Sequence, residues 1–218
     1  MFYSFFSYLC TVKNMDENTA FLEKASQLFI ENGAKSLTMD DIAKEFGMSK
    51  KTLYQKYANK EALLSDVLHF KMEEVIEKMM NLDDHVVNAI ERMFCRDEQI
   101  ETAMEANKSL LIRQLLKYYP AIFSKHMMQF SERFTDVMVH NIQRGREQGY
   151  YHDNFDSKLY GKMFFQLVTS YDSSPFFNTD EINRSHFNNE AMLFFLNAIT
   201  TEKGKDYLKN VIRKPNNG

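Results

Sequence analysis

The alternation of apolar and polar positions is helical along most of the chain. From residue 38 to residue 60, apolar residues recur at spacings of three and four in two short runs separated by Gly47. Thr38 and Ser49 stand where helix N-caps are expected, and Gly47 supplies the backbone freedom of a sharp turn. This pattern predicts a helix-turn-helix, whose second helix lies in a DNA major groove. The inward positions are Ile42, Ala43 and Phe46 in the first run, and Leu53 and Tyr57 in the second.

The outward positions of the second run are basic or polar, and no acidic residue falls between Phe46 and Lys60. The formal net charge of the whole chain is −3, so any basic footprint for DNA is local. Lysine donates to guanine O6 and N7, and glutamine pairs with the adenine edge, which makes three of these residues candidates for base contacts: Lys50, Lys51 and Gln55. The candidates for phosphate contacts are Tyr54, Lys56 and Lys60, with hydroxyl contacts from Thr38, Ser49 and Thr52. The alternative is a solvated helix face with no nucleic-acid role.

Residues 18–65 carry a more specific pattern, which is similar to the start of the TetR family of bacterial transcriptional repressors. The positions in register are Ala25, Leu28, Phe29, Gly33, Thr38, Ile42, Ala43, Gly47, Ser49, Thr52, Leu53, Tyr54, Tyr57, Lys60 and Glu61. The resemblance implies a one-component regulator that binds palindromic double-stranded DNA as a homodimer and is released by a small apolar ligand. Many relatives carry arginine or another polar donor near Asp40 and Asp41, so no base contact is expected from that helix. Relatives often have a small residue at Lys51.

The rest of the chain resembles the family in helical layout and length only. Apolar stripes predict an all-α fold. The resemblance implies that this fold divides into a three-helix DNA-binding domain at 15–62 and a helical regulatory and dimerisation domain at 63–218. Pro120 is expected to end one helix and open the next. The expected helices span residues 59–82, 84–106, 108–119, 120–148, 156–171, 186–200 and 203–213, with a connector at 145–156 and a polar loop at 172–185.

The body is rich in Phe, Tyr and Met, of which the chain has 19, 11 and 14. At helical spacing such residues form an ordinary core, although together they can also line an apolar pocket. The resemblance places that pocket within residues 84–171. The expected lining is Met93, Phe94, Ile112, Phe123, His126, Met127, Phe130, Tyr160, Met163, Phe164, Gln166 and Tyr171.

The resemblance also implies that the helices at 156–171 and 186–200 pair with those of a second copy. Gly161, Leu167, Val168, Phe187, Met192, Phe195 and Leu196 are the expected apolar face. A helical ligand-binding or scaffolding protein without DNA activity remains the alternative, since the overall charge is acidic.

The sequence indicates neither an enzyme nor a cofactor or metal protein. It has no HExxH or CxxC spacing, no GxSxG elbow, no glycine-rich phosphate loop and no carboxylate pair suited to catalysis. Two cysteines, Cys10 and Cys95, fit a reducing cytoplasm. Residues 1–14 are apolar and aromatic but too short to span a membrane, and translation starting at Met15 is one explanation. A packed extension and an amphipathic anchor are the others.

Overall fold

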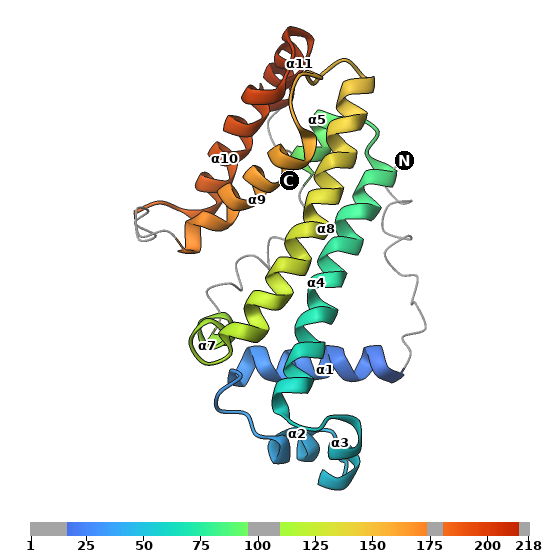
Figure 1. The fold of residues 1–218 in the computed structure, drawn as a ribbon, viewed down its shortest axis with the longest axis vertical. Coiled ribbons are helices and arrows are strands. Elements are labelled where there is room, and N and C mark those ends of the chain that lie inside the picture. Colours follow the sequence, from blue (N-terminus) through green and yellow to red (C-terminus); the bar gives the residue numbers. More distant parts are fainter. Residues whose placement is uncertain (1–16, 96–109, 174–180, 214–218) are drawn as a thin grey trace. The chain divides into compact units, whose positions relative to one another are not determined.

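The structure is a computed structural model that describes residues 17–95, 110–173 and 181–213. These residues form α-helices joined by short connections (Figure 1), and within them the only extended pairing is an isolated bridge between Tyr151 and Thr200. The predicted all-α fold is confirmed. The predictions for residues 1–14, for Cys10 and for residues 174–180 of the polar loop lie outside the described residues.

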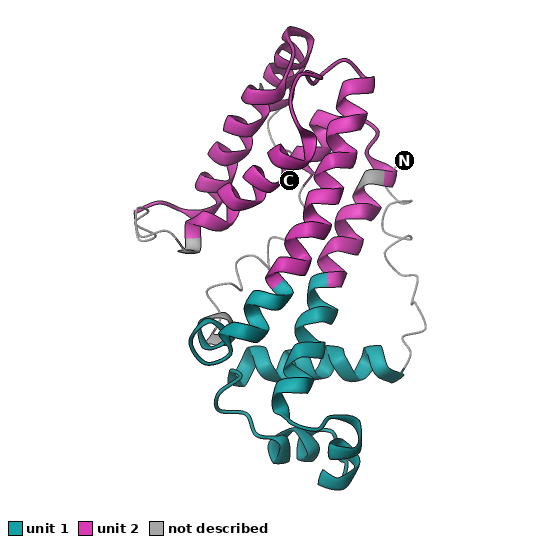
Figure 2. Cartoon of the chain, in the orientation of Figure 1, with its two compact units in different colours: residues 1–72, 104–126 teal, residues 73–103, 127–218 magenta. Residues whose placement is uncertain are grey.

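The chain divides into two compact units (Figure 2), of which unit 1 comprises residues 1–72 and 104–126. Its helices are α1 (Glu17–Asn32), α2 (Met39–Glu45), α3 (Lys50–Lys56), the first part of α4 (Lys60–His85), α7 (Leu110–Tyr118) and the start of α8 (Pro120–Glu147). All of them contribute to one apolar core, whose most deeply buried members include Phe29, Ile42, Leu53, Leu63, Leu64 and Leu115. The segment predicted to be the DNA-binding domain therefore shares its core with α7, which comes much later in the chain.

Unit 2 comprises residues 73–103 and 127–218. It contains the later parts of α4 and α8, together with α5 (Ala89–Phe94), α9 (Ser157–Ser173), α10 (Arg184–Ile199) and α11 (Glu202–Arg213). Helix α9 packs beside α10, and α5 packs beside α11. The core of this unit includes Ile76, Ile90, Ile142, Leu196 and Ile199, all fully buried. Rings also meet across the helices, as between Phe164 and Phe195, whose centroids are 4.5 Å apart.

The single helix predicted over residues 84–106 is wrong in its first part. Helix α4 continues to His85, and a new short helix, α5, begins after Asn88. The Asn88 side chain accepts hydrogen bonds from the backbone N–H groups of Ile90 and Glu91, which makes it an N-cap. Residues 96–106 lie outside the described part of the chain.

The connector predicted to start at Gly145 begins later, because α8 continues to Glu147. Gly149 ends the helix in the left-handed conformation, with φ of +73°. The N–H groups of Gly149 and Tyr150 donate to the carbonyls of Arg146 and Gly145, at 2.9 and 2.8 Å, which is the hydrogen-bond pattern of a Schellman cap. Gly145 is needed for a different reason, since a Cβ atom there would lie 2.0 Å from the Tyr151 ring.

Candidate nucleic-acid interface

Helix α2 is fixed at its first residue by a capping box. The backbone N–H of Asp41 donates to the Thr38 hydroxyl at 3.2 Å, and the N–H of Thr38 donates to the Asp41 carboxylate at 3.0 Å. The Thr38 hydroxyl also donates to this carboxylate, and that hydrogen bond, followed by the one from the Thr38 N–H, lowers the pKa of the Asp41 carboxyl. Asp41 thus stabilises the start of α2.

The turn between α2 and α3 is a second Schellman cap, formed around Gly47. Gly47 has φ of +63° and no neighbour near its missing Cβ, so the position requires glycine for conformation rather than for space. The N–H of Gly47 donates to the Lys44 carbonyl, and the N–H of Met48 donates to the Ala43 carbonyl. Met48 lies half-buried and packs against the core of unit 1.

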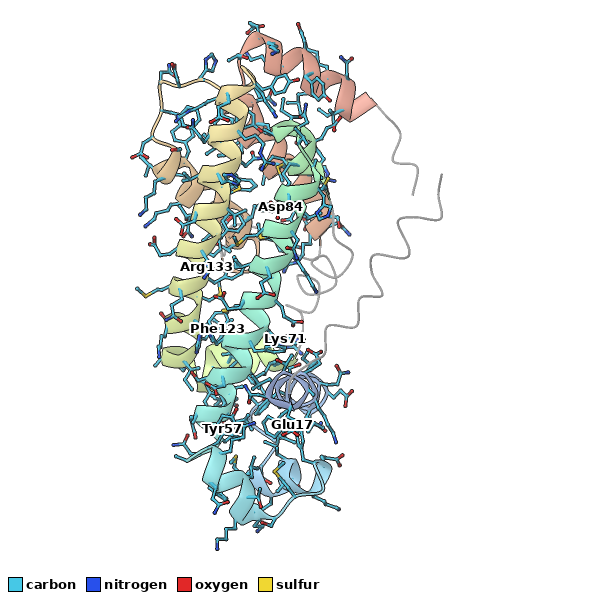
Figure 3. The ribbon with its side chains drawn as sticks, turned by 90° about the vertical axis from the view of Figure 1, so that its right-hand side faces the viewer. Glu17, Tyr57, Lys71, Asp84, Phe123 and Arg133 are labelled. Carbon is cyan, nitrogen blue, oxygen red and sulfur yellow. The ribbon has the colours of Figure 1, made fainter. Side chains whose placement is uncertain are left out.

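Helix α3 is anchored at both ends and presents a polar face. Ser49 is the N-cap, and its hydroxyl oxygen accepts a hydrogen bond from the backbone N–H of Thr52 at 3.1 Å. The helix ends at its C-cap Tyr57, whose backbone is extended. Leu53 and Tyr57 are buried, and Tyr57 (labelled in Figure 3) stacks with Phe21 of α1 at 5.9 Å between ring centroids. The residues between and before them are all exposed: Lys50, Lys51, Thr52, Tyr54, Gln55 and Lys56.

Two of the exposed lysines on α3 have partners inside the same unit. The Lys50 ammonium forms an ion pair with the Asp40 carboxylate of α2, which raises the pKa of Lys50 mainly through that hydrogen bond. The Lys56 ammonium lies over the Phe21 ring, 4.2 Å from its centroid. By contrast, the Lys51 and Gln55 side chains have no hydrogen-bonding or charged partner in the described part of the chain.

The hydroxyl groups proposed for DNA contacts are already hydrogen-bonded. Ser49 and Thr52 share a hydrogen bond of 2.8 Å between their hydroxyl oxygens, and the Thr38 hydroxyl donates to Asp41. All three residues are nevertheless exposed. Their first role is to hold the helix starts in place.

Lys60 differs from the expectation of a phosphate contact. Its ammonium donates to the backbone carbonyls of Ala34 and Leu37 at 2.8 and 2.9 Å, and to that of Lys35 at 3.3 Å. Its three N–H donors are therefore directed at the loop between α1 and α2. The geometry assigns Lys60 to tethering this loop, a role that its position next to Glu61 in the sequence did not indicate.

The predicted ligand-binding residues do not gather at one place. Ile112, whose side chain lies outside the described residues, belongs to unit 1 with Phe123 and His126, and the others belong to unit 2. His126 is buried, with Nε2 2.8 Å from the Ser65 hydroxyl. Met163 and Gln166 are exposed on α9, which differs from the prediction that they line a pocket. The members that do pack together are Met93, Phe94, Phe130, Tyr160 and Phe164, in the core of unit 2.

The two remaining residues of the predicted ligand-binding list are Tyr171 and Met127. The Tyr171 hydroxyl donates to the Ile182 carbonyl at 2.7 Å, and the Arg184 guanidinium lies over the Tyr171 ring. Met127 is half-buried. A pocket of about 680 Å³ does exist in unit 2, and none of the predicted residues lines it. Its lining is His85, Val86, Val87, Asn88, Glu91, Cys95, Gln148, Tyr150 and Lys203.

Residues 21–67 match the family model described as bacterial regulatory proteins, tetR family. This region of the chain belongs to the TetR family. This match covers α1, the helix-turn-helix and the first residues of α4, the region in which the sequence motif was found. The TetR-family chain is accordingly a transcriptional regulator.

Relatives of known sequence or structure agree with this membership. The chain is 23% identical over 143 residues to the HTH-type transcriptional repressor KstR2 of Mycobacterium tuberculosis, covering 63% of this chain and 70% of that protein. A transcriptional regulator from Cytophaga hutchinsonii has the same fold, with a TM-score of 0.69 at 16% identity over 84% of this chain and 97% of that one. The regulator FadR from Bacillus subtilis, solved in complex with stearoyl-CoA, gives a TM-score of 0.60 at 16% identity, and the match covers 83% of this chain and 98% of that one.

In the described part of the TetR-family chain, no helix has the length and apolar character needed to cross a membrane. The tertiary partners of Lys50, Lys56 and Lys60 were missed by sequence reasoning, because the partners are up to 35 residues away. A clue was present only for Asp41, which lies three residues after Thr38 in the spacing of a capping box.

Proposed function

We propose that this regulator is a homodimeric repressor that binds palindromic operator DNA through α3 and is released by a small apolar ligand. The observation that carries the DNA-binding proposal is the exposed row Lys51, Tyr54 and Gln55 on a helix capped at its start by Ser49. A recognition helix needs such polar side chains, fixed in direction and accessible to base edges.

The roles divide according to what each side chain already contacts. Among the residues that the structure describes, Lys51 and Gln55 have no hydrogen-bonding or charged partner, and they are proposed to contact bases. Lys50 would join them when it exchanges Asp40 for DNA. Tyr54 and Lys56 are proposed to contact phosphate. The hydroxyl groups of Thr38, Ser49 and Thr52 are proposed to lie near the DNA phosphate backbone and to contact it without reading the base sequence.

The test begins with selection of a preferred duplex from a library with randomised central base pairs. Binding is then measured by fluorescence anisotropy on the selected duplex and on a scrambled one, at several salt concentrations. Lys51→Ala and Gln55→Ala should each lose discrimination worth about 1–3 kcal/mol per base contact. Lys125→Ala, an exposed lysine on α8, is the matched control. A parent protein with no salt-dependent affinity for any duplex would favour the scaffolding alternative.

The dimer is proposed to form through α9 and α10, but through a different face from the one expected. Phe195 and Leu196 are buried within the chain at 6% and 0% exposure, and Gly161 packs against Met138 and Thr135. They therefore cannot form the face as first predicted. The large apolar side chains exposed on these helices are Leu159, Met163 and Phe194, at 53%, 57% and 72%. An exposed apolar surface of this kind on two adjacent helices suits a second copy of the chain.

The ligand is proposed to bind in unit 2, in the region of Phe130 and Phe164. The support is the aromatic cluster there, together with the stearoyl-CoA in the related structure of FadR. Screening apolar compounds, with stearoyl-CoA as the first, by thermal shift and by DNA anisotropy tests this point. A compound that raises the melting temperature and lowers DNA affinity supports induction. Binding without any change in DNA affinity contradicts it.

A further inference from the structure

The loop between α1 and α2, residues 33–37, is held by side chains that come from far along the chain. The backbone N–H of Lys35 donates to the Gln114 side-chain carbonyl of α7. The Tyr119 hydroxyl, at the junction of α7 and α8, lies 3.4 Å from the Ala34 carbonyl. Helix α7 lies against α1 and within the same compact unit as the helix-turn-helix (Figure 2).

The side chain of Lys35 makes a second connection to α7. Its ammonium lies 3.3 Å from the Tyr118 hydroxyl and 4.6 Å from the centre of the Tyr118 ring. The hydrogen bond from Lys35 lowers the pKa of Tyr118. The Lys35 residue is thus held at its backbone by Gln114 and at its side chain by Tyr118.

Gly33 shows how closely Gln114 approaches the loop. Gly33 has φ of +76°, and a Cβ atom there would lie 2.8 Å from both polar atoms of the Gln114 amide. The amide therefore occupies the space that a side chain at residue 33 would fill. Only a glycine allows both the left-handed turn and this contact.

We propose that α7 acts as a brace for the DNA-binding head, with Gln114 and Tyr118 as positioning residues for α2 and α3. The loop they hold ends at Leu37, directly before the Thr38 cap of α2. Fixing Lys35 therefore fixes the direction in which α2 leaves α1, and with it the direction of α3. The consequence for DNA affinity rests on the proposed function, whereas the brace itself does not.

The brace gives α7 a regulatory meaning. Gln114 and Tyr118 are on a helix that contains none of the proposed DNA contacts, and a shift of α7 removes the acceptor of the Lys35 N–H. Lys60 of α4 still holds three carbonyls of the loop, so the loop loosens without detaching. Movement of α7 would thereby change the orientation of the recognition helix while the rest of the head stays folded.

The experiment compares variants that keep or remove the acceptor. Gln114→Met preserves length and removes the acceptor, whereas Gln114→Glu keeps an oxygen for the Lys35 N–H. Leu116→Gln, at an exposed position of α7, is the control for changes on this helix. Tyr118→Phe tests the second connection separately. Amide hydrogen exchange over residues 33–41 is measured on the full chain without DNA, and anisotropy with the selected duplex follows.

Loss of one such hydrogen bond is expected to speed exchange of the Lys35 amide about fivefold in Gln114→Met, with a similar fall in DNA affinity. Gln114→Glu and Leu116→Gln should match the parent in both measurements. Exchange in Gln114→Met that equals the parent overturns the brace. Faster exchange with unchanged affinity for the selected duplex overturns its role in positioning α3. A parent that binds no duplex refutes the proposed function instead, and the exchange data then still decide whether the brace exists.

Discussion

The Lys50 ammonium of α3 forms an ion pair with the Asp40 carboxylate of α2, across the turn of the helix-turn-helix. Both side chains are largely exposed, so the pair is a weak contributor to stability. Its main effect is electrostatic, because Asp40 neutralises a lysine on the face that is proposed to meet DNA.

Replacing Asp40 by asparagine should therefore strengthen DNA binding. The substitution removes a negative charge near the DNA phosphates and frees Lys50 to neutralise one more phosphate. The slope of log affinity against log salt concentration should then steepen by about 0.9. Anisotropy titrations across a salt series measure both quantities. Asp153→Asn, the same charge change in an exposed loop of unit 2, should leave them unchanged. Weaker binding by Asp40→Asn would mean that the pair orients Lys50 rather than competing for it.

Replacing Lys60 by methionine should destabilise the head as well as affect DNA binding. The substitution leaves the carbonyls of Ala34 and Leu37 without their charged donor, at a cost of about 2 kcal/mol. Urea unfolding followed by circular dichroism measures the loss. Lys125→Met controls for the change in charge. Parent-like stability combined with uniformly weaker binding to all duplexes would restore Lys60 as a phosphate contact.

Tyr57 should make the stability of the head sensitive to alkaline pH. Burial, followed by the neighbouring Asp66 carboxylate, raises the pKa of Tyr57 to about 12, above the value of about 10 expected in the unfolded chain. Folding thus favours the neutral phenol, and its contribution is complete below pH of about 10 and lost as the pH rises toward about 12. From about one pH unit below to one unit above the unfolded pKa of about 10, Tyr57→Phe should lose less stability than the parent. Tyr54→Phe, at an exposed tyrosine, should behave as the parent does.

Replacing Gly145 by alanine should cost about 2–3 kcal/mol of unfolding free energy, since the new methyl group would overlap the Tyr151 ring. That ring cannot move freely, because Tyr151 is buried and its hydroxyl donates to the Ala89 carbonyl at 3.1 Å. In Gly149→Ala the new methyl group would make only ordinary van der Waals contact with the Lys203 side chain, at 3.6 Å, but the backbone is left-handed, so the substitution should cost only about 1 kcal/mol. Urea denaturation of the two variants gives the comparison. Equal costs would show that the backbone, and not the ring, limits residue 145.

Replacing Phe194 by aspartate should separate a dimer into monomers that remain folded. Phe194 is 72% exposed in the single chain, so a charge there costs little unless a second copy covers it. Light scattering coupled to size-exclusion chromatography measures the mass, and circular dichroism checks the fold. Leu196→Ala is the contrasting variant, because removing a fully buried leucine should cost about 2–5 kcal/mol whatever the oligomeric state. A dimer that survives Phe194→Asp would exclude this face.

The sequence by itself determined the local structure of the head. Thr38, Gly47 and Ser49 specify caps and a turn through hydrogen bonds to residues within five positions, and such short-range signals are readable from spacing alone. Pro120 likewise marked the start of α8, since proline lacks the N–H that an interior helical position must donate. The short helix α5 was missed because its cap, Asn88, interrupts an otherwise continuous helical pattern.

Only the tertiary structure decided which side chains are exposed and free to contact DNA or a second copy of the chain. Phe194 and Phe195 are adjacent in sequence, and the packing of α10 against α9 decides that Phe195 is buried within the chain and Phe194 is exposed. Lys51 and Lys60 are both lysines of a basic stretch, but the Lys60 ammonium donates hydrogen bonds to carbonyls of a loop 23 to 26 residues earlier. Gln114 contacts Lys35 across 79 residues. Contacts between segments so distant are set by the packing of the whole core, which no local periodicity encodes.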